Sequence, residues 1–110
     1  MYLCIVKICI SEMRIVSKKT INQYVVNNPQ AMRPLDDWYK KTKEADWHNF
    51  ADIRRTFATV SQVGNDRYVF NIKGNDYRLV VIILFTPHTV YIRFIGTHEE
   101  YDKIKDIQNI

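Results

Sequence analysis

The first half of the chain carries apolar residues at helical spacing, and this spacing predicts three short helices. The first follows Ser17, a favoured N-cap residue, and ends at Asn28-Pro29 because proline disfavours helical geometry in the residue before it. Pro34 opens the second helix as a good first helical residue, and Asn49 caps the third. The residues expected on the inner faces are Ile21, Tyr24 and Val25, then Leu35, Trp38 and Tyr39, then Phe50, Ile53 and Phe57.

The second half alternates apolar, β-branched runs with turn residues, which is typical of an antiparallel sheet. The pattern predicts four strands, with turns at residues 64–66, at Gly74-Asn75 and at Pro87-His88. Thr97 and Glu100 match a helical capping box and predict a closing helical turn over His98 to Tyr101. The predicted fold is α+β, with N-terminal helices packed on one face of a four-stranded antiparallel sheet. The predicted strands are residues 59–63, 67–72, 77–85 and 89–95.

Turn length decides which side chains share a face of this sheet, because side chains alternate along a strand. A two-residue turn at Gly74-Asn75 places Asn71 opposite Arg78, and one at Pro87-His88 places Ile82 opposite Arg93. One face is then apolar throughout and forms the core, whereas the other presents cations among valines and isoleucines. The expected core face holds Phe70, Ile72, Tyr77, Leu79, Val81, Ile83, Phe85, Val90, Ile92 and Phe94, and the open face holds Asn71, Lys73, Arg78, Tyr91 and Arg93.

Length and charge narrow the function classes. With 110 residues the chain is long enough for one small core, which excludes most enzymes that need separate cofactor and substrate domains. Sixteen Lys and Arg against twelve Asp and Glu give a net charge of +4, which favours polyanionic partners. The two cysteines, Cys4 and Cys9, form no framework that spans the fold, so a reducing cytoplasm is expected.

Residues 1–12 stand apart from the expected domain at 13–110, because Met13 to Val16 followed by Ser17 is typical of a short strand leading into a helix. They are either an extra edge strand or an extension from an early start codon. The apolar run within them is broken by Lys7 and lacks the flanks of a signal peptide, and it is too short to span a bilayer.

The residues on and beside the open face have the components of RNA cleavage without a metal. Arg78 and Arg93 suit phosphate, because a guanidinium group binds its oxygens in pairs. His98 is a candidate acid or base because imidazoles titrate near neutral pH, and Tyr101 shares its helical face. The alternative is structural: His98 and Tyr101 stabilise the fold, and nearby carboxylates such as Asp76 neutralise the cations. The sequence shows no cluster with zinc-ligand spacing, and neither His48 nor His88 is expected to form a metal site with His98.

These segments, taken together, resemble the HigB toxin family. The resemblance rests on Val69 to Asn75, Tyr77 to Leu79 and Val90 to Asp102, with Pro34-Leu35, Trp38-Tyr39 and Ala45 to Trp47 in the helical half, and it runs from about residue 13 to residue 105. It implies a RelE-like fold and the toxin of a type II toxin–antitoxin pair that cuts messenger RNA in the A site of the translating ribosome. It also implies a HigA-like helix-turn-helix antitoxin as partner, with oligomers formed only through that complex, and no metal or other cofactor.

Carried over position by position, the resemblance assigns Arg78 and Arg93 to phosphate or transition-state contacts. It makes His98 and Tyr101 the acid and base candidates. The RNA contacts that it implies are Asn71, Lys73 and Asn75. The alternative function is a non-catalytic RNA- or ribosome-binding module, or a toxin of the gyrase-directed type, that uses the same basic face.

Overall fold

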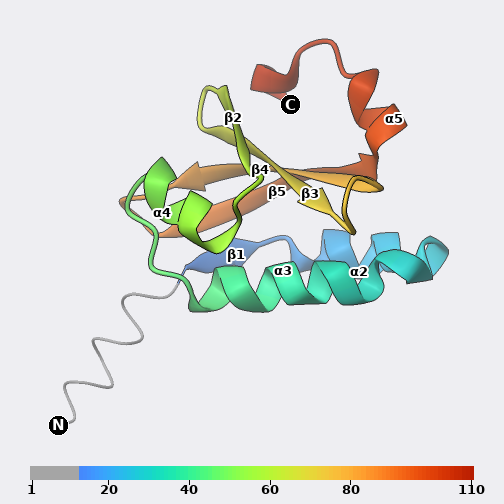
Figure 1. The fold of residues 1–110 in the computed structure, drawn as a ribbon, viewed down its shortest axis with the longest axis horizontal. Helices are drawn as coiled ribbons and strands as arrows, with labels where there is room; N and C mark the ends of the chain where they lie inside the picture. Colours follow the sequence, from blue (N-terminus) through green and yellow to red (C-terminus); the bar gives the residue numbers. More distant parts are fainter. Residues whose placement is uncertain (1–12) are drawn as a thin grey trace, which may run out of the picture.

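The structure is a computed structural model that describes residues 13–110, so the expectations for residues 1–12 lie outside the described residues. In chain order the elements are β1 (Arg14–Val16), α2 (Lys18–Asn27), a 3-10 turn (Pro29–Ala31), α3 (Met32–Glu44), α4 (Phe50–Thr56), β2 (Ser61–Gly64), β3 (Arg67–Ile72), β4 (Tyr77–Leu84), β5 (Thr89–Thr97), α5 (His98–Asp102) and a 3-10 turn (Ile107–Asn109). Helices α2 to α4 precede the four strands β2 to β5, as the hydrophobic pattern predicts, while a short strand lies before the helices and a short helix after the strands (Figure 1).

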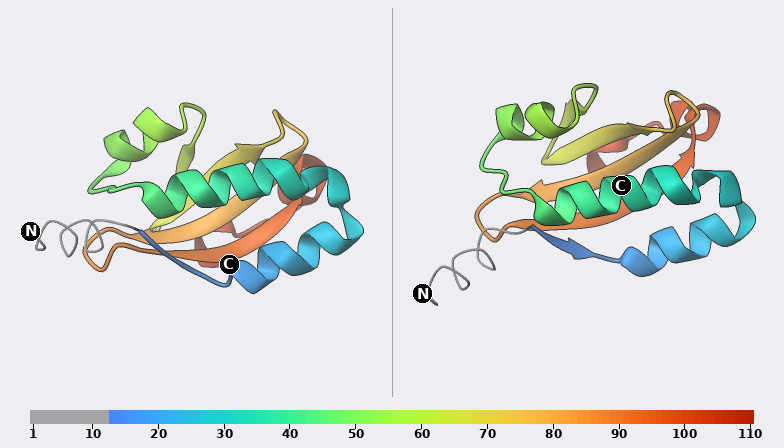
Figure 2. Two further views of the ribbon diagram at one scale, coloured as in Figure 1. Left: turned by 90° about the horizontal axis from the view of Figure 1, so that it is seen from below. Right: turned by 60° about the horizontal axis from the view of Figure 1, so that its bottom comes forward.

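The sheet has five strands in the order β1-β5-β4-β3-β2, which corrects the prediction of four antiparallel strands. The additional strand, β1, lies at the edge and runs parallel to β5, with Ile15 opposite Val90. Three residues are too few to show a strand periodicity of their own, so only pairing with β5 identifies β1 as part of the sheet. Helices α2 and α3 cross one face of the sheet, and the end of the chain lies over the other (Figures 1 and 2).

The predicted helices form, with two corrections at their starts. Ser17 precedes α2 but has a left-handed backbone, and its side chain accepts no capping hydrogen bond. Helix α3 starts at Met32, two residues before Pro34, which is tolerated there because the first-turn N–H groups have no intrahelical partner. Asn49 caps α4 as predicted, since its side chain accepts a hydrogen bond from the Asp52 backbone N–H.

The predicted β3–β4 register is confirmed, with Asn71 opposite Arg78. The β4–β5 connection differs, because Leu84 pairs with Thr89 and the turn contains four residues, 85–88. Ile82 therefore lies opposite Tyr91, and the predicted pairing of Ile82 with Arg93 is wrong. The turn is two residues longer than predicted, but Tyr91 still lies on the predicted face, because side-chain direction along a strand repeats every two residues.

A β-bulge in β5 changes the faces further along the strand. Val81 pairs with Ile92 and Val80 with Phe94, so Arg93 is the extra residue between them. The bulge turns Phe94 away from the core face, which corrects its assignment to the core, and Ile95 takes its place against the core. The core cluster otherwise follows the predicted face, with Trp38 and Trp47 packed against Phe70.

Candidate functional site

The β3–β4 turn gathers several of the predicted site residues at one end of the sheet. Asn71 and Arg78 are half-buried neighbours on adjacent strands. The Arg78 Nη1 atom donates hydrogen bonds to the carbonyl oxygens of Asn75 at 3.0 Å and Tyr77 at 3.2 Å. The Asn71 side chain donates to the Asn75 side chain at 3.4 Å. These contacts hold the Arg78 guanidinium group beside the turn.

Helix α5 is attached to the same turn. The His98 backbone N–H donates to the Asp76 carbonyl oxygen at 3.2 Å, and the Lys73 ammonium group lies 3.4 Å from an Asp76 carboxylate oxygen. Lys73, Asp76 and His98 line one shallow pocket together with Gln30, Tyr77, Thr97 and Glu99. The structure therefore brings Lys73 and His98 together, and we call Asn71, Lys73, Asn75, Arg78 and His98 the turn cluster.

The orientation of His98 follows from the capping box that starts α5. The Thr97 hydroxyl accepts from the Glu100 N–H at 3.1 Å, and the Glu100 carboxylate accepts from the Thr97 N–H at 2.8 Å. His98 is exposed, with Nδ1 3.8 Å from an Asp102 oxygen and Nε2 3.9 Å from a Glu99 oxygen. Both distances exceed a hydrogen bond, so the imidazole remains accessible to a substrate.

Helix α2 supports this end of the sheet through Tyr24. Its ring meets the Tyr77 ring edge-on at 6.1 Å. Burial, and next the nearby charges of Glu100 and Tyr77, raise the pKa of Tyr24 above its ordinary value.

Tyr101, three residues after His98, is half-buried, and among residues 13–110 its hydroxyl forms no side-chain hydrogen bond.

Arg93 belongs to a different group of contacts on the same face. Its Nε donates to the carbonyl oxygen of Ile110 at 3.1 Å, and Nη2 of Arg67 donates to the same atom at 2.8 Å. Further along the segment, the Gln108 side chain donates to the Val63 carbonyl oxygen at 3.0 Å, and Asn65 donates to the Gln108 carbonyl oxygen at 2.8 Å. Residues 103–110, the C-terminal segment, are thereby attached to the face that the sequence predicts to be open (Figure 1).

This segment corrects the expectation of an open face. Val69 and Val80 lie on that face by register, yet they are only 3% and 0% exposed and do not belong to the core cluster on the other side. Ile82 and Leu84 are half-buried, and Tyr91 remains exposed. The basic face is therefore accessible at its ends and covered at its centre.

Arg67 is a candidate site residue that sequence reasoning missed. It lies opposite Ile82, on the same face as Asn71 and Arg78, so strand alternation from Asn71 back through Val69 identifies it. Its Nε is buried without a hydrogen-bond partner among the described residues, while its other nitrogens bond to the carbonyl oxygens of Asn65 and Ile110. Within residues 13–110, none of Arg67, Arg78 and Arg93 forms an ion pair with Asp or Glu.

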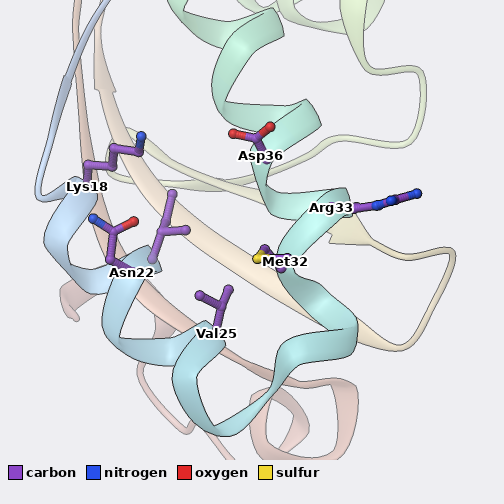
Figure 3. Close-up of a pocket in the computed structure, with 7 residues that line it drawn as sticks. Lys18, Asn22, Val25, Met32, Arg33 and Asp36 are labelled. Atoms are coloured by element: carbon purple, nitrogen blue, oxygen red, sulfur yellow. The ribbon is translucent and has the colours of Figure 1, made fainter.

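A separate pocket lies between α2 and α3 (Figure 3). Its lining is mixed, and it contains none of the predicted site residues. The lining residues are Lys18, Ile21, Asn22, Val25, Met32, Arg33 and Asp36.

In the part of the chain that the structure describes, no helix is long and apolar enough to cross a membrane.

Comparison with known proteins shows which protein family this chain resembles. Residues 31–104 match the family described as HigB_toxin, RelE-like toxic component of a toxin–antitoxin system. An Escherichia coli O6:H1 protein named mRNA interferase HigB is 28% identical over 94 residues, which cover 84% of this chain and 91% of that protein. The mRNA interferase toxin HigB of Escherichia coli K12 is 49% identical over 35 residues, 32% of this chain and 34% of that protein. The family match spans α3, the sheet from β2 to β5 and helix α5, so this chain belongs to the RelE-like HigB toxin family.

Proposed function

We propose that this chain is the toxin of a type II toxin–antitoxin pair and acts as an mRNA interferase, an endoribonuclease that cuts messenger RNA in the ribosomal A site. Family membership and the names of the two relatives support the class of activity. The proposed location of the site rests on one observation, the attachment of α5 to the β3–β4 turn. This attachment places His98 beside Lys73 in one pocket, next to the Asn71–Arg78 pair.

The turn cluster, Arg93 and Tyr101 supply the groups that cleavage requires. The ribose 2′-oxygen attacks the adjacent phosphorus, its proton passes to a base, and the 5′-oxygen leaves with a proton from an acid. The products are a 2′,3′-cyclic phosphate and a 5′-hydroxyl end. Arg78 and Arg93 stabilise the extra negative charge on the phosphate, while His98 and Tyr101 provide the proton transfers. Asn71, Lys73 and Asn75 position the RNA.

The proposal of ribosome dependence is supported by how few groups of the site can orient RNA. The pocket beside His98 is shallow, Lys73 is paired with Asp76, and Arg93 is held by the C-terminal segment. A free RNA would have to be ordered by a few exposed side chains, whereas an A-site codon is already held in place. The antitoxin partner is proposed to be a HigA-like helix-turn-helix protein. A small reading frame of that type immediately downstream of this gene would support the pairing, and its absence would weaken it.

The test is primer extension on a defined message incubated with purified protein, with and without translating ribosomes. Wild type is compared with His98→Ala and Arg93→Ala, and Arg54→Ala on the exposed side of α4 serves as a charge-matched control. Cuts that need ribosomes, persist in the control and vanish in the two site variants are expected. Cuts without ribosomes would indicate a free ribonuclease. Absence of cuts in every lane would favour the non-catalytic binding module or gyrase-directed toxin.

A further inference from the structure

Three side chains of the types that bind metal ions meet at the end of the sheet away from the turn cluster. Asp46 and His48 come from the connection between α3 and α4, and His88 comes from the β4–β5 turn. One potential ligand atom from each lies within 4.8 Å of the other two. We propose that Asp46, His48 and His88 form a binding site for a divalent transition-metal ion of the Zn²⁺ class.

The buried side chain of Trp47 orients two of these residues. Trp47 is 2% exposed, packs against Phe57 and Phe70, and donates from Nε1 to the Thr56 hydroxyl at 3.1 Å. Because Trp47 points into the core, its neighbours Asp46 and His48 are both directed outward. The His48 backbone N–H also donates to the Asp52 carboxylate at 3.0 Å, which attaches it to the start of α4.

The third residue, His88, is held independently by its backbone. It has a left-handed φ of 50°, its N–H donates to the Phe85 carbonyl oxygen at 3.0 Å, and its carbonyl oxygen accepts from the Arg14 N–H at 2.6 Å. These bonds close the β4–β5 turn and join it to β1. The imidazole is mostly buried, with 22% of the side chain exposed. A ligand held this firmly loses little freedom when an ion binds.

The distances suit one ion. Oδ1 of Asp46 lies 3.1 Å from Nε2 of His88 and 3.2 Å from Nε2 of His48. Ligands bonded at about 2.0–2.1 Å in a tetrahedral site lie roughly 3.3 Å from one another. The two imidazole rings are nearly perpendicular, at 87° with centroids 5.4 Å apart, and the more exposed His48 ring can turn to complete the site.

Two imidazoles and one carboxylate favour Zn²⁺, Ni²⁺ or Cu²⁺ over Mg²⁺ or Ca²⁺, which prefer oxygen ligands. Three protein ligands leave a fourth position for water or another small donor. The ion would join the α3–α4 connection to the β4–β5 turn, two segments about 40 residues apart in the sequence. This site stands at the opposite end of β4 from Arg78, so the inference does not depend on the proposed function (Figure 1).

The experiment titrates Zn²⁺ into the full chain after dialysis against EDTA, with binding followed by calorimetry and unfolding by circular dichroism. Wild type should bind one Zn²⁺, and a hundredfold excess over Kd should raise the Tm by on the order of 10 °C. Co²⁺ should give the visible absorption of tetrahedral coordination. His88→Ala and Asp46→Asn should weaken binding at least tenfold. His48→Ala should do the same with least risk to folding, because 62% of the His48 side chain is exposed.

Two controls separate this site from other ligands in the chain. His98→Ala removes the third histidine, which lies near Glu99 and Asp102, and a variant with Cys4 and Cys9 replaced by serine removes both thiols. Both should bind Zn²⁺ as tightly as wild type. Unchanged affinity in His48→Ala and His88→Ala, loss of binding in the cysteine variant, or no binding by wild type at 100-fold molar excess would each overturn the proposal.

Discussion

Arg67 in β3 and Arg93 in the β5 bulge donate hydrogen bonds to the same atom, the carbonyl oxygen of Ile110. Two guanidinium groups on the proposed RNA face are thus occupied by the C-terminal segment rather than by an Asp or Glu side chain of residues 13–110. A phosphate group offers several charged oxygens that guanidinium groups bind in pairs, so it competes with Ile110 for both arginines. RNA that reaches both arginines must therefore displace Ile110.

Loosening the C-terminal segment should strengthen RNA binding. Asn65→Ala with Gln108→Ala removes two of the hydrogen bonds that attach the segment, without changing either arginine. Both bonds are exposed and belong at the low end of the usual contribution, about 0.5 kcal/mol each, so affinity for a short RNA should rise by roughly fivefold. Fluorescence anisotropy at a fixed salt concentration measures the change. Equal or weaker binding by the double variant would show that the segment does not compete with RNA.

Arg78 should be the most sensitive cation of the turn cluster. Its guanidinium group uses Nη1 to bond to the carbonyl oxygens of Asn75 and Tyr77, which leaves its other nitrogens to face phosphate. Arg78→Ala should reduce the cleavage rate by about 10²–10³-fold, the usual effect of losing one donor to a transition-state anion. Arg78→Lys should recover only part of that loss, because an ammonium group cannot bind two oxygens in a fixed fork.

Ribosome-dependent cleavage, quantified by primer extension, provides the measurement for the Arg78 variants. Arg54→Ala in α4 removes the same charge from the helical layer and should leave the rate unchanged. Equal losses in Arg54→Ala and Arg78→Ala would mean that net charge, rather than the position of Arg78, controls cleavage.

Gly96→Ala should weaken both the fold and the site. An alanine Cβ at this position would meet the Phe94 ring at 2.6 Å and the Glu100 carboxylate at 2.8 Å. Moving Glu100 breaks its bond to the Thr97 N–H and releases the start of α5, which carries His98. We expect a loss of about 1–3 kcal/mol in unfolding free energy, and a reduction in cleavage that persists at temperatures where the variant is folded.

Urea unfolding and primer extension test the Gly96 variant together. Gly74→Ala is a useful comparison, because a Cβ there meets nothing within 4 Å, although its φ of 63° also disfavours alanine. If Gly96→Ala loses stability but cleaves at the wild-type rate when folded, the capping box does not position His98 for catalysis.

Alkaline pH should destabilise the protein through Tyr68. Burial, and next the charge of Asp66, raise the pKa of this phenol, and a hydrogen bond from Gln62 lowers it by less. A raised folded-state pKa contributes stability that is fully present below the ordinary pKa of about 10 and is lost as pH rises above it. Tyr68→Phe should therefore show a smaller fall in urea midpoint between about pH 9 and pH 11 than wild type.

Tyr91→Phe is the matched control for Tyr68, because the Tyr91 ring is exposed on the other face. It should follow the wild-type pH dependence. A Tyr68→Phe profile that coincides with wild type would assign the alkaline loss to other groups, among them Tyr24, whose pKa burial also raises.

Local sequence patterns determined the elements and part of the site. The β3 bounds, the end of α2 at Asn28-Pro29, the Asn49 cap and the Thr97 capping box all depend on residues close together in the chain. The Asn71–Arg78 pairing was predictable for the same reason, since a short turn sets the register of a hairpin. Propensity, capping and turn geometry act over a few residues, so the sequence displays them directly.

Tertiary structure alone decided the features that join distant segments. Pairing of β1 with β5 added the parallel edge strand, and the bulge at Arg93 moved Phe94 to the opposite face. Docking of the C-terminal segment covered the centre of the basic face, and packing of Trp47 brought Asp46 and His48 to His88. Each depends on contacts between residues far apart in the chain, where the net free energy of packing and hydrogen bonding selects one arrangement that no local pattern records.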